Sequence, residues 1–246
     1  PSPGVCRETL AGLLPRSGAL GGKVALATGG SRGLGAALCH ALTIEGCRVI
    51  LNYWQSREAA EGVAADVRAA GGAIELVAAD AGNSAAYLDI RRRVMVGYGG
   101  LDILVCNASP PIRPLDLDAG AADRLVEFVG RSTALTAVPL AAFLDALSER
   151  SGWCVLVSSE YVRTVPAEYP HYVAAKAALE ALVRAVGVRR PAVRVLVPRP
   201  PRILTDQTNT ALGRRNAISV ERVAARIVNR LCVGAGPQQL EFLEDF

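Results

Sequence analysis

Short apolar runs alternate with longer segments of helical period along most of this chain. Each run is rich in Val, Ile and Leu and shows no polar alternation, which is typical of strands that helices cover on both faces. The pattern therefore predicts an α/β fold with a doubly wound parallel sheet, three layers deep, in a single domain. The predicted strands are 24–27, 49–52, 74–78, 103–106, 155–157 and 193–197, with a last short strand at 240–243.

Segments of helical period separate these strands. Gly71 and Gly99 mark two helix ends, where a left-handed residue is needed. The chain has 246 residues, enough for one such domain and too few for a second large one. Residues 1–19 are predicted as a linker or N-terminal extension with a short amphipathic helix at 5–14, and the domain as 20–246. The predicted helices of the domain are 34–45, 57–70, 84–98, 121–149, 172–186 and 220–231.

Charge and cysteine usage exclude several classes of partner. The 27 basic and 23 acidic residues leave a net charge of +4 and form no stripe, so nucleic acid is not an expected partner. The apolar stretch 132–144 is too short to cross a bilayer, so no membrane partner is expected either. The six cysteines form no CxxC pair and have no neighbouring His, which predicts no metal site and no disulfide framework. A reducing, cytoplasmic location is expected.

A glycine-rich loop, Thr28-Gly29-Gly30-Ser31-Arg32-Gly33-Leu34-Gly35, follows the first predicted strand, and a helix begins at once. Glycine permits the tight turn and lets backbone N–H groups approach a phosphate, which then lies at the helix N-terminus. This context predicts a dinucleotide-binding loop. The alternative is a plain turn between strand and helix.

The TGxxxGxG spacing of this loop resembles that of the short-chain dehydrogenase/reductase family, especially its ketoacyl reductase branch. The resemblance extends from about residue 20 to the C-terminus and implies a Rossmann fold that binds a nicotinamide dinucleotide. The loop residues that it assigns to cofactor binding are Gly29, Ser31, Arg32, Gly33, Leu34 and Gly35.

In this family the end of the second strand selects between NAD and NADP. An acidic side chain there would bind the ribose 2′-hydroxyl, but residues 52–57 contain none. Arg32, Ser56 and Arg57 offer donors for a 2′-phosphate instead, and Tyr53 lies beside them in the sequence. The expected cofactor is therefore NADP(H). The alternative for Arg57 is an exposed residue in the first turn of a helix.

The resemblance also assigns cofactor contacts after three later strands. Asp80 and Ala81 match the adenine-contacting position, although Asp80 could be a turn residue before a helix. Asn107, Ala108 and Ser109 follow the fourth strand, where Ser109 replaces a family glycine. The residues that match the carboxamide-binding positions are Ile203 and Thr205.

Tyr172 and Lys176 stand four residues apart, on one face of a predicted helix. Reduction of a ketone needs a proton donor, and a neighbouring ammonium is expected to lower the phenol pKa from its ordinary value near 10. Ser159, thirteen residues earlier, matches the family serine that binds the substrate carbonyl. The resemblance thus implies a catalytic set of Ser159, Tyr172 and Lys176, with the last two also at the cofactor. His171 is expected at the surface or as a capping residue, and His40 as structural.

The sequence departs from the family at three places. The helix 121–149 lacks the Asn that holds a water near the lysine, so Ser132 or Thr133 would hold it, or proton supply would be slower. Pro200-Pro201 replaces Pro-Gly, which removes a backbone donor. The lid that follows, 206–219, is short and polar, which indicates an open substrate site.

Two hypotheses remain. The first is an NADPH-dependent ketoreductase acting on a β-ketoacyl thioester, either as a small molecule or on a carrier protein, in polyketide or fatty-acid biosynthesis. The second is a degenerate member of the family with a docking or structural role. The intact Ser, Tyr and Lys favour the first.

A homodimer or homotetramer through helix 121–149 is expected. Five arginines could form a basic rim for an acidic carrier, although scattered exposed arginines are the favoured alternative. They are Arg113, Arg131, Arg163, Arg199 and Arg202.

Overall fold

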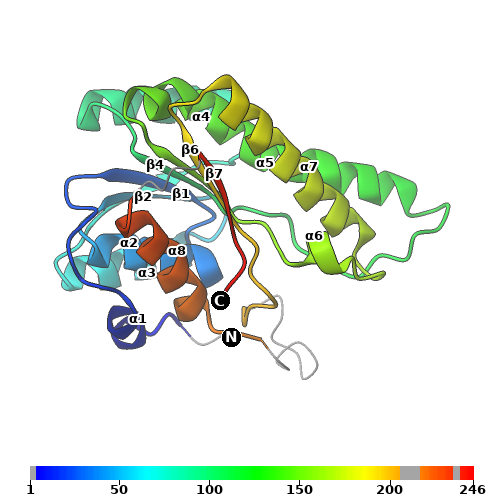
Figure 1. Ribbon diagram of the computed structural model, residues 1–246, viewed down its shortest axis with the longest axis horizontal. Helices are drawn as coiled ribbons and strands as arrows, with labels where there is room; N and C mark the ends of the chain where they lie inside the picture. Colours follow the sequence, from blue (N-terminus) through cyan, green and yellow to red (C-terminus); the bar gives the residue numbers. More distant parts are fainter. Residues whose placement is uncertain (1–3, 206–216, 235–238) are drawn as a thin grey trace.

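A single parallel sheet runs through the protein, with strand order β3-β2-β1-β4-β5-β6-β7 (Figure 1). The computed structural model describes residues 4–205, 217–234 and 239–246. The strand order reverses between β1 and β4, and ligands of open α/β sheets bind beside the carboxyl ends of strands at such a point. The strands are β1 (Val24–Thr28), β2 (Arg48–Tyr53), β3 (Ala73–Ala78), β4 (Ile103–Cys106), β5 (Trp153–Leu156), β6 (Arg194–Pro198) and β7 (Leu240–Leu243).

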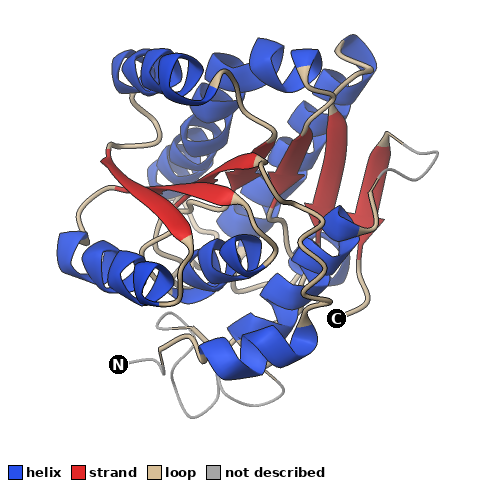
Figure 2. Ribbon diagram, turned by 90° about the vertical axis from the view of Figure 1, so that its left-hand side faces the viewer, coloured by secondary structure: helices blue, strands red, loops and turns tan. Residues whose placement is uncertain are grey.

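Helices cover both faces of the sheet, as the turned view shows (Figure 2). Helices α2, α3 and α8 pack on one face, and α4, α5 and α7 on the other. The predicted doubly wound, three-layer fold is therefore confirmed. The helices are α1 (Arg7–Leu13), α2 (Gly33–Ile44), α3 (Arg57–Ala69), α4 (Ser84–Tyr98), α5 (Ala122–Glu149), α6 (Tyr161–Thr164), α7 (Pro170–Arg189) and α8 (Val220–Cys232).

Element boundaries differ from the predicted ones by a few residues. Helix α7 begins at Pro170 rather than at residue 172, because proline at the first helical position has its φ already set and needs no N–H partner. Strand β5 begins at Trp153, two residues earlier than predicted. The four-residue helix α6 was not predicted, since it is too short to show a helical period.

Two apolar cores lie on the two faces of the sheet. Leu51 and Val155 belong to the core under α2, α3 and α8, and Leu26 and Leu104 to the core under α4, α5 and α7. None of these four side chains has exposed surface. The central strands are thus apolar on both faces, as the unalternated runs predicted.

The N-terminal extension is attached to the domain. Helix α1 packs against α2 and α8, and Leu10 is fully buried there. The Glu45 carboxylate accepts hydrogen bonds from the backbone N–H groups of Arg16 (2.7 Å) and Ser17 (3.1 Å). His40 in α2 is buried and lies 3.4 Å from an Arg7 guanidinium nitrogen, which agrees with the predicted structural role.

Helix α5 is long and apolar enough, by length and composition, to cross a membrane, and it is the one such helix among the described residues. In this fold it lies on the sheet, with Phe143 and Leu147 fully buried in the core. Only 28% of its apolar window is buried within the chain. Much of its apolar surface therefore faces away from the core.

Candidate active site

The glycine loop joins β1 to α2 in a turn that requires glycine at two points. Gly29 has φ +65° and Gly33 has φ +54°, both in the left-handed region. At Gly35 a Cβ atom would lie 2.1 Å from the Gly29 carbonyl oxygen, so no larger residue fits against the loop. The loop therefore holds the first turn of α2 close to the end of β1.

The N-terminus of α2 has the properties of an anion site. Among the described residues no side chain caps it, and its N-cap residue Arg32 is extended. The first N–H groups of a helix have no intrahelical partner and carry a partial positive charge. This end of α2 thus fits the pyrophosphate of a dinucleotide cofactor.

Asn107 fixes the loop after β4 to the glycine loop. Its side-chain amide donates to the carbonyl oxygens of Thr28 and Gly29, each at 3.1 Å. The Thr28 hydroxyl in turn accepts from the backbone N–H groups of Asn107 and Ala108, each at 3.0 Å. The two loops that border the predicted cofactor site are therefore held together by this asparagine and threonine.

Two of the three predicted phosphate-binding residues lie together. The Arg32 guanidinium donates a hydrogen bond to the Ser56 hydroxyl, which brings the glycine loop and the end of β2 into contact. Arg57 instead forms an ion pair with Glu61 at 2.7 Å and is 78% exposed. In this structure Arg57 is therefore an exposed residue in the first turn of α3, which is the alternative given in the sequence analysis. Tyr53, at the end of β2, is buried.

Asp80 has an ionic partner that sequence reasoning did not supply. Its Oδ1 accepts from the Arg131 guanidinium at 2.7 Å and from the Gly82 N–H at 2.8 Å. Burial opposes its ionisation, but these hydrogen bonds outweigh burial and hold the pKa of Asp80 below its ordinary value. The carboxylate predicted to meet adenine is therefore already anchored to α5. Ala81 beside it is buried.

The remaining predicted cofactor residues lie on loops after β4 and β6. The Ser109 hydroxyl donates to the Pro110 carbonyl oxygen at 3.2 Å. Ile203 pairs with Ile218 in a short bridge. Thr205 lies over the glycine loop, since a Cβ on Gly33 would be 3.4 Å from its methyl group. Residues 206–216 of the predicted lid lie outside the described residues.

The three predicted catalytic residues come together at the ends of β5 and α7. Lys176 Nζ lies 5.6 Å from the centre of the Tyr172 ring and donates to the Val157 carbonyl oxygen at 2.6 Å. Ser159, two residues further along, is buried; its hydroxyl accepts from the Tyr161 N–H at 3.2 Å and acts to lower the pKa of Tyr172. A proton donor, a polar hydroxyl and a buried cation are thus gathered in one site.

The expected lowering of the Tyr172 pKa is wrong for this structure. Burial raises the pKa of Tyr172 to about 12, and the hydrogen bond with Ser159 only partly opposes that rise. Burial also lowers the pKa of Lys176 to about 8. The ammonium is bound to the Val157 carbonyl oxygen and lies 5.6 Å from the centre of the Tyr172 ring, so burial of the phenol decides its pKa.

The family model for short chain dehydrogenases matches residues 23–215. The chain belongs to the short-chain dehydrogenase family. Among solved structures, a short chain dehydrogenase from Burkholderia cenocepacia in complex with NADP is 30% identical, with a TM-score of 0.79, over 92% of this chain and 96% of that one. A dehydrogenase/reductase from Sinorhizobium meliloti is 25% identical, with a TM-score of 0.79, over 97% of both chains.

Curated relatives match over shorter stretches. Versicolorin reductase 1 of Aspergillus parasiticus is 43% identical over 89 residues, which are 36% of this chain and 34% of that protein. An uncharacterized oxidoreductase of Mycobacterium bovis is 34% identical over 200 residues, 75% of this chain and 58% of the relative. The chain thus spans about a third of the first relative and just over half of the second.

Helix α5 lacks the asparagine that the family resemblance led us to expect near Lys176. Of the two residues considered there, Thr133 donates its hydroxyl to the Val129 carbonyl oxygen at 2.8 Å. Ser132 is buried, and its hydroxyl has no partner among the described residues. Buried hydroxyls normally find a partner or an ordered water. Of the two residues, Ser132 is therefore the one whose hydroxyl is available to bind a water molecule.

His171 is buried, contrary to the predicted surface or capping role. Its ring meets Phe128 edge to face, with centroids 4.5 Å apart, and burial lowers the pKa of its imidazole. Tyr172 is next to this pair, and Tyr161 meets Tyr172 at 90° with centroids 6.1 Å apart. Tyr169 stacks on Tyr161 at 5.7 Å. Half-buried aromatic rings thus surround the reactive phenol.

The predicted basic rim is largely neutralised. Arg131 pairs with Asp80, and both Arg163 and Arg199 pair with Glu244. The Arg202 guanidinium donates to the Tyr161 hydroxyl at 3.2 Å. Of the proposed rim residues, only Arg113 has no such bond among those that the structure describes. Most of these arginines thus have partners within the described residues, and the docking of an acidic carrier at them stays a prediction.

The Pro200-Pro201 turn joins the loop after β6 to the loop after β5. Pro200 is buried, and its carbonyl oxygen accepts from the Glu160 N–H at 3.1 Å, one residue after Ser159. Pro200-Pro201 therefore still helps to hold the segment after β5 that carries Ser159.

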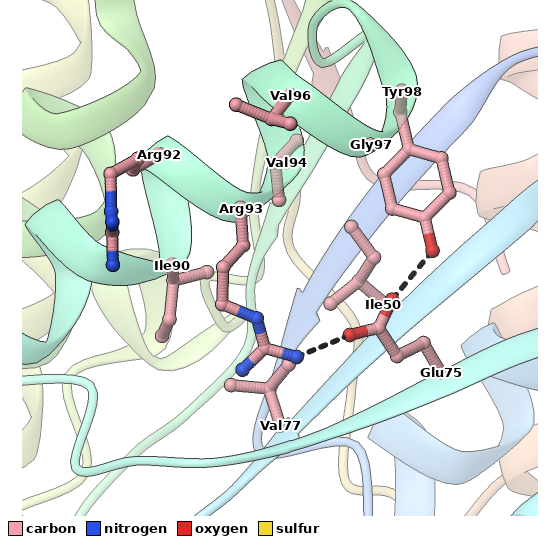
Figure 3. Close-up of a pocket in the computed structure, with 10 residues that line it drawn as sticks. All are labelled: Ile50, Glu75, Val77, Ile90, Arg92, Arg93, Val94, Val96, Gly97 and Tyr98. Carbon is pink, nitrogen blue, oxygen red and sulfur yellow. Dashed lines mark hydrogen bonds and ion pairs between the residues drawn. The ribbon is translucent and has the colours of Figure 1, made fainter.

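A cavity of about 400 Å³ lies elsewhere in this dehydrogenase, between α4 and the strands β2 and β3 (Figure 3). Ile50 and Val77 form apolar walls, and Arg93 and Tyr98 both bind Glu75 beside it, at 2.7 and 2.5 Å. None of the predicted site residues lines it. Among the described residues, no three His, Cys, Asp or Glu side chains are grouped to hold a metal ion.

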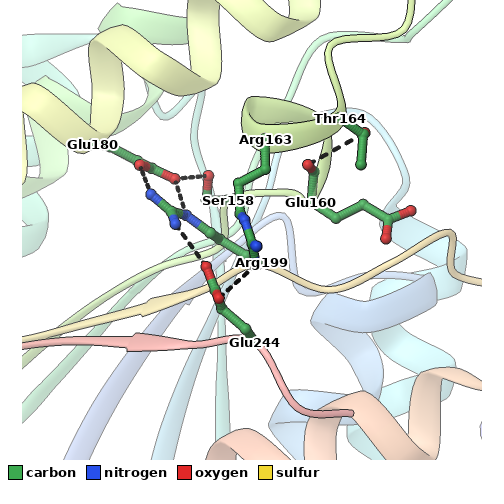
Figure 4. Close-up of polar contacts among 7 residues, drawn as sticks. All are labelled: Ser158, Glu160, Arg163, Thr164, Glu180, Arg199 and Glu244. Carbon is green, nitrogen blue, oxygen red and sulfur yellow. Dashed lines mark hydrogen bonds and ion pairs between the residues drawn. The ribbon is translucent and has the colours of Figure 1, made fainter.

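Sequence reasoning missed Glu180 and its ion pair with Arg199, which lies beside Ser158 (Figure 4). Glu180 stands four residues after Lys176 and eight after Tyr172, so the helical period placed it on their face. That spacing was a usable signal. No such signal indicated its cationic partner, because Arg199 follows strand β6 and meets α7 only in the folded protein.

Proposed function

We propose that this protein reduces a ketone to a secondary alcohol with NADPH. The observation that carries the proposal is the convergence of Ser159, Tyr172 and Lys176 near the carboxyl end of β5. At the same edge of the parallel sheet, β1 leads into α2, whose N-terminus no side chain of the described residues caps. A bound nicotinamide supplies the hydride. A protein of this family acting on C=O groups needs no other redox group.

The chain's own residues have separate tasks in this reaction. The Tyr172 hydroxyl gives its proton to the carbonyl oxygen as negative charge develops there. Ser159 donates a hydrogen bond to the same oxygen and stabilises that charge. Lys176, whose ammonium lies 5.6 Å from the centre of the Tyr172 ring, holds the Val157 carbonyl oxygen and with it the strand end that leads to Ser159. Its ammonium would also bind the ribose hydroxyls of the cofactor.

We propose NADPH rather than NADH because of the contact between Arg32 and Ser56. An arginine of the glycine loop beside a hydroxyl that follows β2 suits a 2′-phosphate, and no carboxylate stands in residues 52–57 to bind a free 2′-hydroxyl. The Burkholderia structure in complex with NADP supports this choice.

We propose two substrate classes, which one experiment separates. The first is a β-ketoacyl thioester of polyketide or fatty-acid biosynthesis, presented as a small molecule or on a carrier protein. The second is a ketone fused to a flat aromatic ring, which the half-buried rings of Phe128, Tyr161 and Tyr169 around Tyr172 favour. Stacked or edge-to-face ring pairs contribute about 0.5–1.5 kcal/mol beyond the area they bury.

We further propose a homodimer or homotetramer in the cytoplasm. Helix α5 has apolar residues outside the core, such as Val126 at 67% exposure, and Val188 near the end of α7 is 86% exposed. A second copy would cover this surface. All six cysteines are free, and burial raises the pKa of Cys39 to about 12, which suits a reducing compartment.

The test follows NADPH absorbance with two ketones, a short β-ketoacyl thioester surrogate and a bicyclic aromatic ketone. Turnover by the parent that Tyr172→Phe abolishes supports a reductase, and the preferred ketone identifies the substrate class. Equally slow rates in the parent and in Tyr172→Phe would instead favour the second hypothesis, a degenerate member of the family with a docking or structural role. A titration of the protein with NADPH then separates failed chemistry from failed binding.

A further inference from the structure

Two side chains of α7 hold consecutive residues of the segment that leads to Ser159. Lys176 Nζ donates to the Val157 carbonyl oxygen at 2.6 Å. One helical turn later, the Glu180 carboxylate accepts from the Ser158 hydroxyl at 2.6 Å. The position of Ser159 relative to α7, and so to Tyr172, therefore depends on both contacts.

Glu180 carries a charge that needs compensation, because its side chain is only 4% exposed. Arg199, just after β6, supplies it with two parallel bonds, Nε to Oε1 at 2.9 Å and Nη2 to Oε2 at 2.6 Å. Burial disfavours the carboxylate, yet the bonds from Arg199 and Ser158 outweigh burial and keep the pKa of Glu180 below its ordinary value.

The C-terminal segment fixes Arg199 in turn (Figure 4). Glu244 accepts from the Arg199 guanidinium at 2.7 Å, and the Phe242 ring lies 4.1 Å from the guanidinium carbon. The Arg199 N–H also donates to the Leu243 carbonyl oxygen at 2.8 Å. A planar guanidinium held by two carboxylates and an aromatic ring has little rotational freedom.

Glu244 also reaches the other side of the catalytic residues. Its second oxygen accepts from Arg163 of α6 at 2.6 Å. Helix α6 carries Tyr161, whose ring packs edge-on against Tyr172. One carboxylate near the C-terminus thus contacts both Arg199, the partner of Glu180, and the helix beside Tyr172.

We propose that Glu244, acting through Arg199 and Glu180, is a positioning residue for the catalytic set. This inference rests on the reductase function proposed above. The segment 242–244 closes a polar network that sets the distance between Ser159 and Tyr172 and holds α6 against the phenol. Without the Glu244 charge, Arg199 and Arg163 lose their shared anchor, and the two sides of the site move independently.

The chain offers a matched control for this proposal. Glu241 lies three residues before Glu244 on the same C-terminal segment and pairs with Arg230 of α8, with Arg230 Nε 2.6 Å from Oε1. That pair has no contact with the catalytic residues. Glu244 is 36% exposed and Glu241 25% exposed, so water can reach the arginine that loses its partner in either Gln variant. Both Gln variants should therefore fold.

The experiment compares Glu244→Gln and Glu241→Gln with the parent in NADPH-dependent turnover and in amide hydrogen exchange. For Glu244→Gln we expect kcat to fall by roughly tenfold, as small displacements of catalytic groups do. Peptides covering 158–165 should exchange faster, while the NADPH dissociation constant stays within about twofold, an effect under ~0.5 kcal/mol. Glu244→Asp, which keeps the charge, should recover part of kcat. Glu241→Gln should match the parent in every measurement.

Three results would overturn the proposal. One is unchanged kcat in Glu244→Gln, whatever the exchange shows. Another is an equal loss of kcat in Glu241→Gln, because the effect would then be general stability. The third is a loss of kcat with unchanged exchange over 158–165. A parent without turnover of either ketone would refute the reductase function as well, whereas an active parent with an unaffected Glu244→Gln refutes only the positioning role.

Discussion

Lys176 Nζ lies 2.6 Å from the carbonyl oxygen of Val157, which joins the catalytic helix directly to the strand end that carries Ser159. The lysine therefore has a structural contact in addition to its charge. Burial around this contact lowers the pKa of Lys176 to about 8. A titration of the lysine thus falls in an accessible pH range.

The first prediction concerns the pH dependence of reduction. Because the folded-state pKa of Lys176 lies below the ordinary value near 10.4, the ammonium is lost as pH rises through about 8. The rate should fall along an alkaline limb with an apparent pKa near 8, while Tyr172, with a pKa of about 12, stays protonated. A pH profile of kcat/KM checks this.

Lys176→Arg is the control for that assignment, since arginine stays charged throughout. Its residual activity should show no limb near pH 8. For stability the sign is opposite: between about pH 8 and 10.4 the folded state binds fewer protons than the unfolded state, so this group's contribution to stability rises with pH. A limb near pH 8 that persists in Lys176→Arg would assign it to another group.

The second prediction concerns Tyr172 and Ser159, whose substitution should lower kcat without lowering the stability of the fold. Tyr172→Phe removes the proton donor and should lower kcat by about 10²–10⁴-fold. Ser159→Ala removes a hydrogen bond to the developing oxyanion and should cost about 10²–10³-fold. Melting temperature and NADPH titration should stay near the parent's values. Parent-like turnover in Tyr172→Phe would contradict the assigned role.

The third prediction tests the glycine loop. Gly35→Ala places a Cβ 2.1 Å from the Gly29 carbonyl oxygen, so the loop must move or the helix shift. We expect a loss of about 1–3 kcal/mol in unfolding free energy, as overpacking costs, together with weaker NADPH binding. Chemical denaturation and fluorescence titration measure the two effects.

Gly62→Ala is the matched control, because this exposed helical glycine in α3 has open space around its Cβ position. It should stabilise the protein by about 0.5–1 kcal/mol and leave cofactor binding unchanged. Equal destabilisation of the two variants would remove the steric explanation.

The fourth prediction tests cofactor selection. Arg32→Gln removes the guanidinium that meets Ser56 and should raise the NADPH dissociation constant by about tenfold or more, the loss of one charge-assisted bond, with little effect on NADH. Arg57→Gln should change neither, since Arg57 is exposed and faces Glu61. A larger effect of Arg57→Gln would restore that residue to the phosphate site.

Most of the architecture could be predicted from local patterns. The unalternated runs indicated buried parallel strands, and the predicted strand 103–106 coincides with β4. The glycine loop needed only its neighbours in sequence to be recognised, because a tight turn and a helix N-terminus are local features. The spacing of Tyr172 and Lys176 fixed their common helix face for the same reason.

Tertiary structure alone decided which charges pair. Asp80 meets Arg131 and Arg199 meets both Glu180 and Glu244, pairs separated by 51, 19 and 45 residues. The partners come from separate elements, so no local pattern in the sequence predicted these pairs. The pKa order of Tyr172 and Lys176 likewise depends on burial by other elements. The sequence period determines on which face of its own helix or strand a side chain lies. The packing of separate elements determines which side chain it contacts and how far it is exposed to solvent.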